Sequence, residues 1–160
     1  MVKNSKNLLI KLIFLVSIIA LVSAFFIEYV LGHQPCNLCV LERIPYLLAI
    51  IVVLLNYKFI QFEKFFILLL TIIFLAGTAL SLYHLGIEQG FIQESLVCDL
   101  KSGSNLLSKE EILKQLQEKN VSCKDVTFKI FGLSLTSYNI LMSLLITIGA
   151  GKFYFNYDKN

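Results

Sequence analysis

Charged residues are scarce in this chain of 160 residues, and those present do not gather in one place. Asp, Glu, Lys and Arg make up 16% of the sequence, and the net charge at pH 7 is only +3. The lysines are scattered, so the basic patch that a nucleic-acid surface needs is missing. Nucleic acid is therefore excluded as a partner.

Apolar residues take the place of the missing charge. They make up 57% of the chain, and the mean hydropathy is +0.76. They fall in continuous blocks rather than in amphipathic stripes, as helices that face lipid require. This composition excludes a soluble domain and predicts a multi-pass protein of the lipid bilayer.

Four apolar runs predict four membrane-spanning helices, at residues 8–31, 40–57, 65–85 and 132–150. We expect an all-α membrane protein, a four-transmembrane-helix bundle with two external cysteine-bearing loops, in which residues 1–160 form a single membrane domain. Three lysines before or at the start of the first run, Lys3, Lys6 and Lys11, resemble the start of a signal peptide. The apolar run is longer than a usual signal, so we expect this helix to be retained.

The second run is informative because of its length. From Pro45 to Tyr57 it has 13 residues, about 20 Å at the helical rise, which is too short for a hydrocarbon core of about 30 Å. A start near Val40 brings it to about 27 Å. That start places Cys39 and Arg43 at the membrane boundary.

Four spans put both termini on one side of the membrane and both cysteine-bearing loops on the other. Lysine and arginine number seven on each side, so the positive-inside rule is tied. The first helix breaks the tie, because three lysines precede it and Arg43 alone follows closely. We therefore expect cytoplasmic termini and exported cysteine loops, where disulfides persist.

The second external loop, at about residues 86–131, holds Cys98 and Cys123. Within it, Ser108 and Glu111 form a capping box, which predicts a short helix at residues 109–119. In the fourth span, Asn139 must find a partner inside the bundle, because a polar side chain in lipid is costly.

The four cysteines form one Cys-x-x-Cys pair, Cys36 and Cys39, and two residues 25 positions apart, Cys98 and Cys123. No second Cys-x-x-Cys or His-x-x-x-His accompanies the first pair, so we predict no metal site. Haem attachment would need a histidine after Cys39, and residue 40 is valine. A thioredoxin fold would need strands that four spans do not provide.

A redox role explains the first pair best. A Cys-x-x-Cys bridge closes a very small loop, so it stabilises a fold little and serves better as a redox switch. Arg43 lies one helical turn beyond Cys39 if the helix begins there, and its charge favours the thiolate. His84, at the depth of Cys39, is placed to hydrogen-bond an acceptor's carbonyl or to deliver a proton. We assign no chemistry to His33 or to three boundary carboxylates, Glu28, Glu42 and Glu88.

Three motifs carry a family resemblance over nearly the whole chain. They are P-C-N-L-C followed by E-R-I-P-Y from Pro35, Y-H-L-G-I-E-Q-G from Tyr83, and G-L-S-L-T-S-Y-N from Gly132. With four spans and the order of the cysteines, the chain resembles the DsbB family, quinone-dependent oxidases of disulfide bond formation in the bacterial inner membrane.

The resemblance implies roles for six residues. Cys36 and Cys39 match the pair that faces a membrane quinone, either ubiquinone or menaquinone, while Arg43 and His84 match quinone-site positions. Cys98 and Cys123 match the pair that takes electrons from a periplasmic thioredoxin-fold oxidase, DsbA or a relative. We expect the chain to act as a monomer.

The implied mechanism is a relay. The reduced partner attacks Cys98 and releases Cys123, which attacks Cys36 and frees Cys39 to reduce the quinone. One alternative is a vitamin K epoxide reductase-like bundle, which the reversed order of the cysteine pairs disfavours. Another is a non-catalytic membrane scaffold with two structural disulfides. From the residues alone, the resting disulfide connectivity stays open among three pairings.

Overall fold

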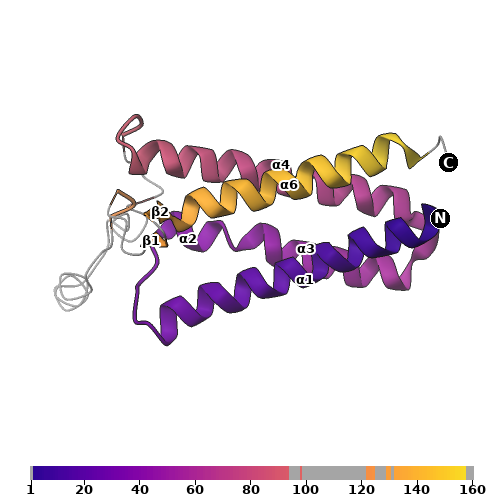
Figure 1. Cartoon of the computed structure of the whole chain (residues 1–160), viewed down its shortest axis with the longest axis horizontal. Helices are drawn as coiled ribbons and strands as arrows, with labels where there is room; N and C mark the ends of the chain where they lie inside the picture. Colours follow the sequence, from indigo (N-terminus) through magenta and orange to yellow (C-terminus); the bar gives the residue numbers. More distant parts are fainter. Residues whose placement is uncertain (1, 94–97, 99–121, 125–128, 131, 158–160) are drawn as a thin grey trace, which may run out of the picture.

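The computed structural model describes residues 2–93, 98, 122–124, 129–130 and 132–157, and these are almost entirely helical (Figure 1). The helices and strands, in chain order, are α1 (Val2–Tyr29), α2 (Asn37–Leu41), α3 (Ile44–Lys58), the 3₁₀ turn η1 (Ile60–Phe62), α4 (Glu63–Glu88), β1 (Lys129–Ile130), β2 (Leu133–Ser134) and α6 (Leu135–Phe155). The helix predicted at residues 109–119 lies outside the described residues.

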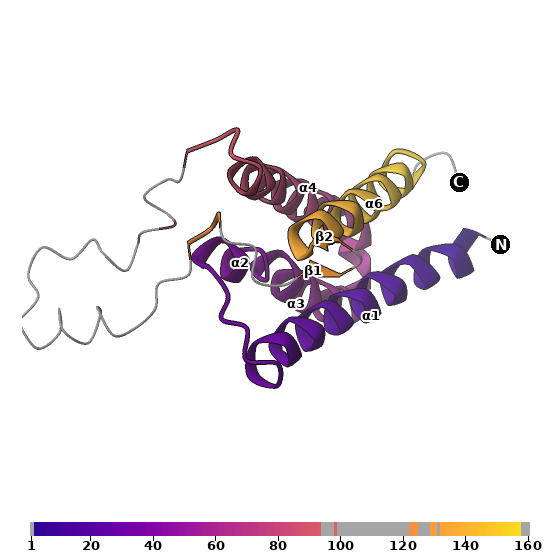
Figure 2. The ribbon, with the colours of Figure 1, turned by 60° about the vertical axis from the view of Figure 1, so that its left-hand side comes forward.

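Four columns of helix lie side by side, with both termini at one end and the cysteine-bearing segments at the other (Figure 1, Figure 2). In the described part of the chain, four helical stretches are long and apolar enough to cross a membrane: Leu8–Tyr29, Asn37–Lys58, Ile60–Glu88 and Leu135–Phe155. The predicted four-helix membrane bundle is confirmed.

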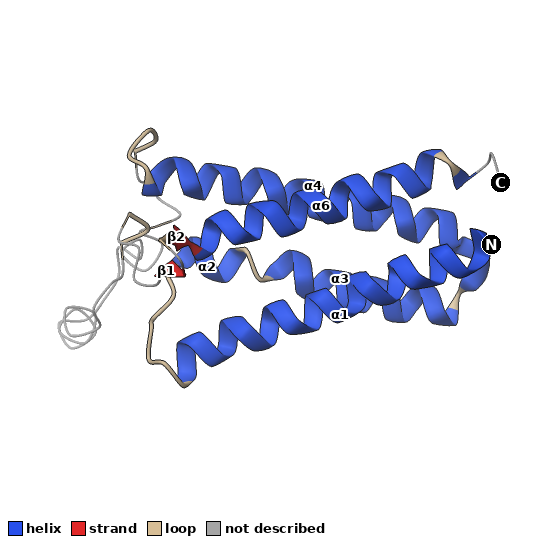
Figure 3. Ribbon diagram, in the orientation of Figure 1, coloured by secondary structure: helices blue, strands red, loops and turns tan. Residues whose placement is uncertain are grey.

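The second column is broken near its cysteine-bearing end, between α2 and α3 (Figure 3). Its 22 residues, Asn37–Lys58, reach about 33 Å at the helical rise, enough to span a hydrocarbon core. The column thus begins three residues earlier than the length arithmetic predicted. Pro45 lies in the first turn of α3, where its missing N–H costs no helical hydrogen bond.

The fourth column begins at Leu135, three residues later than predicted. Gly132 has φ +83°, a conformation that favours glycine, and it turns the chain between β1 and β2. Ser134 then caps α6, since its side chain accepts a hydrogen bond from the backbone N–H of Ser137. A capped turn, rather than a longer apolar run, therefore decides where this helix starts.

An apolar cluster holds the four columns together in the half of the bundle nearer the termini. Its buried members come from every column: Ile10, Ile13, Tyr46, Ala49, Val52, Val53, Phe66, Leu70, Phe74 and Ala150. Above it, Gly77 of α4 lies against Pro45 of α3, where a Cβ on the glycine would come within 3.0 Å of the proline Cγ. The missing side chain lets the two helices approach closely.

A seam of polar side chains joins α4 to α6. Thr78 donates to Ser143 at 3.0 Å, and Thr136 donates to Glu88 at 2.6 Å. Between these two contacts, Asn139 donates to Ser81 at 2.8 Å. Because a polar group inside a membrane must be satisfied within the protein, the seam fixes how α6 is rotated against α4.

We expect Gly77→Ala to destabilise the bundle, because the added methyl group meets a rigid proline ring. Overpacking of this kind costs about 1–3 kcal/mol, which would lower the thermal unfolding midpoint of the purified protein in detergent. The matched control is Gly151→Ala in α6, where the new Cβ would lie 3.6 Å from a methyl group of Thr71, an ordinary contact. Equal midpoints for the two variants would contradict the close approach.

Candidate functional site

Two sulfur atoms meet at the N-terminus of α2. Cys36 is the N-cap residue of this helix, and its Sγ accepts a hydrogen bond from the backbone N–H of Cys39 at 3.2 Å. The two Sγ atoms lie 2.6 Å apart, so little movement separates the pair from a disulfide, whose S–S bond is about 2.05 Å. Hydrogen bonding from Cys39, with a smaller contribution from His84, lowers the pKa of Cys36 below its usual range. This thiol is therefore disposed to react as a thiolate.

Cys98 and Cys123 form a disulfide, with their Cα atoms 6.0 Å apart. Cys123 is 2% exposed, and it packs in one apolar cluster with Cys36, Leu38 and Ile87. Cys98 is half-buried against the same cluster. The structure thus selects one of the three possible pairings and brings both cysteine pairs into a single cluster.

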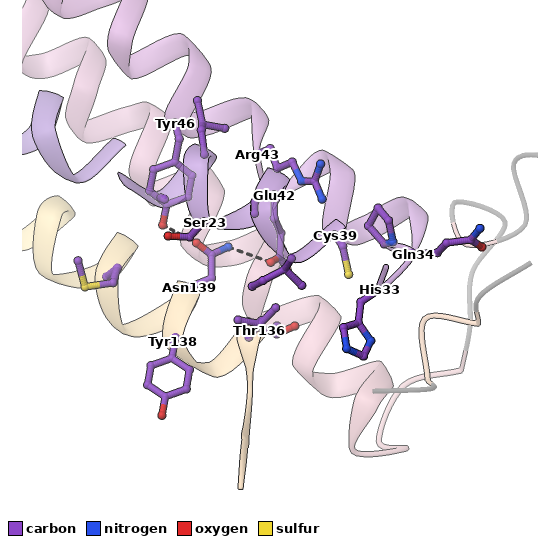
Figure 4. Close-up of a pocket in the computed structure, with 17 residues that line it drawn as sticks. Ser23, His33, Gln34, Cys39, Glu42, Arg43, Tyr46, Thr136, Tyr138 and Asn139 are labelled. Carbon is purple, nitrogen blue, oxygen red and sulfur yellow. Dashed lines mark hydrogen bonds between the residues drawn. The ribbon is translucent and has the colours of Figure 1, made fainter. Parts of the chain in front are cut away.

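Beside the first pair is a cavity of about 250 Å³. It lies between α1, the segment around the α2–α3 break, and the first turns of α6 (Figure 4). Most of its wall is apolar, and its polar side chains include Cys39, Glu42, Arg43, Tyr46 and Asn139. An apolar cavity with a few convergent polar groups is the usual form of a small-molecule site.

Arg43 lines this cavity together with Cys39, as the sequence predicted for a cation near the dithiol. Its guanidinium forms an ion pair with Glu28 of α1 at 2.5 Å and lies 5.2 Å from the ring centroid of Phe25. The side chain is thus held toward α1, the wall of the cavity that lies across from α6. Its expected influence on the Cys39 thiolate stays a prediction.

His84 contacts the other sulfur. Its side chain is 1% exposed, its Nε2 lies 3.5 Å from Cys36 Sγ, and its Nδ1 lies 2.8 Å from Glu42 Oε1. Its Nε2 also lies 3.8 Å from Oε1 of Glu88, one helical turn on. Among the described residues, those that line the cavity do not include His84, but they include two residues whose polar atoms contact its Nδ1, Glu42 and Thr136.

Glu42 is the site residue that the sequence reasoning missed. The sequence places it among the boundary carboxylates, but it is 8% exposed and lies within the second span, in the break between α2 and α3. A carboxylate inside a membrane span is itself a signal of function, and the predicted span of residues 40–57 already contained it.

Two further polar residues hold Glu42 in place. Asn139 donates to Glu42 Oε2 at 2.9 Å, and Tyr46 donates its hydroxyl proton to the side-chain Oδ1 of Asn139. Figure 4 shows this row of contacts along the cavity wall. The partner that Asn139 was predicted to need is therefore this carboxylate, together with Ser81.

The possible metal ligands in this region are Cys36, Cys39 and His84, whose donor atoms all lie within 4.8 Å of one another. Sequence spacing had pointed away from zinc without taking this histidine into account. With Zn–S bonds of about 2.3 Å, two tetrahedral ligands would place their sulfurs about 3.7 Å apart, and here the sulfurs are 2.6 Å apart. The geometry suits sulfur exchange better than metal binding.

Comparison with known proteins agrees with this geometry. The sequence profile described as "Disulfide bond formation protein DsbB" matches residues 6–152. A protein of Rickettsia prowazekii (strain Madrid E), named "Uncharacterized protein RP370", is 37% identical over 146 residues, which cover 87% of this chain and 83% of that protein. A helical membrane bundle with two cysteine pairs is the arrangement that the sequence motifs implied, and the structure adds that the two pairs share one cluster. The chain belongs to the DsbB family of disulfide bond formation oxidoreductases.

Proposed function

We propose that this protein reoxidises a periplasmic dithiol oxidase of the thioredoxin fold, DsbA or a relative, and passes the electrons to a quinone dissolved in the membrane. The observation that carries the proposal is the single apolar cluster that contains Cys36 and Cys123, with Cys39 and Cys98 packed against it. Disulfide exchange requires contact between the attacking and the attacked sulfur. Two pairs in one cluster need only local movement to exchange.

The difference in exposure between Cys98 and Cys123 supports a direction for the relay. A soluble partner can reach Cys98, which is half-buried, whereas Cys123 is buried. Attack on Cys98 would release Cys123 as the thiolate beside Cys36. Exchange with Cys36 would then free Cys39, the sulfur that faces the cavity.

The electron acceptor must be more oxidising than the partner. Dithiol oxidases of the DsbA type have potentials of about −120 mV, and each 30 mV of difference is worth about 1.4 kcal/mol for two electrons. A quinone of the membrane can supply this difference, and an apolar cavity at the lipid boundary suits such a ligand. Arg43 would hold a carbonyl oxygen of the bound ring, and His84 would act behind the cavity wall.

The cellular arrangement follows from the same proposal. We place both termini in the cytoplasm and the cysteine-bearing end of the bundle in the periplasm, in the inner membrane. The chain acts as a single membrane domain and as a monomer. This orientation puts the relay where a periplasmic partner and a membrane quinone can both reach it.

Replacement of Cys39 tests the relay directly. We expect Cys39→Ser to abolish quinone-dependent reoxidation of a reduced thioredoxin-fold partner, because the last sulfur before the cavity is lost. The measurement is partner reoxidation in isolated membranes, with and without added quinone. Equal rates for the variant and the native protein would rule the relay out and favour a scaffold with structural disulfides.

Removal of the cavity cation should weaken quinone binding. A hydrogen bond to a charged group contributes about 1.5–3 kcal/mol, so Arg43→Ala should raise the apparent dissociation constant of a short-chain ubiquinone about 10- to 100-fold. Lys58→Ala, at the far end of α3, is the matched control and should leave it unchanged. If both variants bind the quinone as the native protein does, Arg43 is not part of the site.

Labelling with a membrane-impermeant maleimide tests the orientation. In a variant whose other three cysteines are replaced by serine, Cys98 should react from outside intact bacterial cells whose outer membrane has been permeabilised. A cysteine-free chain carrying Asn156→Cys, at the end of α6, should react only after lysis. The reverse pattern would place the cysteine-bearing end in the cytoplasm.

A further inference from the structure

Glu42 joins two parts of the site that are otherwise separate. On one side its Oε1 lies 2.8 Å from His84 Nδ1, and on the other side Glu42 lines the cavity. The side chain is almost fully buried. A carboxylate that contacts both a buried histidine and a ligand cavity is well placed to transfer a proton between them.

The two sulfurs of the first pair differ in what they face. Cys39 lines the cavity, while Cys36, in the described structure, is outside its lining and contacts His84 instead. Oxidation of two thiols by a quinone moves two electrons and two protons. The proton of Cys39 can pass straight to a molecule in the cavity, but the proton of Cys36 needs another route.

The contacts supply that route in three steps. Cys36 Sγ lies 3.5 Å from His84 Nε2, the opposite ring nitrogen lies 2.8 Å from Glu42 Oε1, and Glu42 borders the cavity. We propose that Glu42 is the proton carrier between His84 and the electron acceptor in the cavity. This inference rests on the proposed function, and it assigns Glu42 a catalytic role that the sequence did not indicate.

The step balances as follows. In the reduced site the Cys36 proton resides on His84 as an imidazolium, and Cys39 is a thiol. As the Cys36–Cys39 bond forms, two electrons pass to the quinone, the Cys39 proton goes to one quinone oxygen, and the imidazolium gives its Nδ1 proton through Glu42 to the other. The products are a disulfide, a quinol and a neutral histidine, which is charged again when the next pair of thiols brings its protons.

The surroundings of Glu42 favour proton transfer through its carboxylate over a fixed ion pair with an arginine. The adjacent cation, Arg43, is paired with Glu28 of α1 instead. From α6, Asn139 donates to Oε2, an amide contact that orients the carboxylate and leaves Oε1 to the histidine. Tyr46 of α3 holds Asn139 in turn. Asn139 and Tyr46 are thus positioning residues.

His84 has a second pair of neighbours, Thr136 and Glu88. Thr136 Oγ1 lies 3.3 Å from Nδ1 and borders the cavity, but it donates its hydroxyl proton to Glu88 at 2.6 Å. Glu88 is also 3.8 Å from Nε2, but the described lining of the cavity does not include it. Glu88 therefore offers a matched control, a carboxylate beside the same histidine that is not part of the described lining of the cavity.

The experiment compares Glu42→Gln with Glu88→Gln in the full-length protein in detergent. The rate measured is the reduction of a short-chain ubiquinone by dithiothreitol, in water and in deuterium oxide. General acid–base catalysis contributes about 100- to 10,000-fold, so Glu42→Gln should slow reduction at least about 100-fold and raise the solvent isotope effect. Quinone affinity and the thermal midpoint should change little, and Glu88→Gln should stay within about threefold of the native rate.

Chemical rescue separates proton transfer from a purely structural role. Glu42→Ala opens space beside His84 and the cavity, and added formate should restore part of the lost rate because a free carboxylic acid can occupy that space. A loss of rate that formate does not restore would assign Glu42 a structural role and overturn the inference. An equal loss of rate in Glu42→Gln and Glu88→Gln would overturn it as well. The effect would then come from the loss of a negative charge beside His84, whichever carboxylate carried it.

The outcomes also distinguish this inference from the proposed function. If the native protein reduces the quinone and Glu42→Gln does so equally fast, the proton route is wrong while the relay stands. If the native protein itself does not reduce the quinone with a dithiol, the proposed function fails, and the proton route fails with it.

Discussion

The hydrogen bond between Glu42 and His84 is the contact on which the arrangement of the site depends. It ties the break in the second column to α4, and Asn139 extends the connection to α6. In a bilayer no water competes for these groups, so each must be satisfied by a neighbouring helix. Three columns are therefore held in one register at the level of the sulfur pair.

Much of the architecture could be predicted because lipid imposes simple rules on sequence. Apolar runs of membrane length identified the four spans. The polar side chain of Asn139 in mid-span indicated a hydrogen-bond partner inside the bundle. The residues at which the spans begin and end were harder to predict. Val40 was chosen from length alone, whereas the helical column begins at Asn37 because Cys36 caps it, and caps depend on local hydrogen bonds rather than on hydropathy.

Part of the site could be predicted as well, because spacing and position along a span can be read from the sequence. Cysteine spacing identified Cys36 and Cys39, and position along the third span placed His84 at their depth. Hydropathy treats a charged residue at a boundary as a solvated one, so Glu42 was set aside although it is buried. Which sulfur a histidine contacts depends on how α4 is rotated, and that rotation is set by side chains of α6 far along the chain.

The burial of Cys123 beside Cys36 has a kinetic consequence. Because both sulfurs already lie in one cluster, exchange between them is an intramolecular event, with an effective concentration in the millimolar range or above. Its rate is then independent of how much of the protein the membrane holds, and a dissolved thiol at lower concentration competes poorly for the same disulfide. In the proposed relay, the cluster would therefore insulate the flow of electrons from the surrounding thiol pool while leaving Cys98 open to a docked partner.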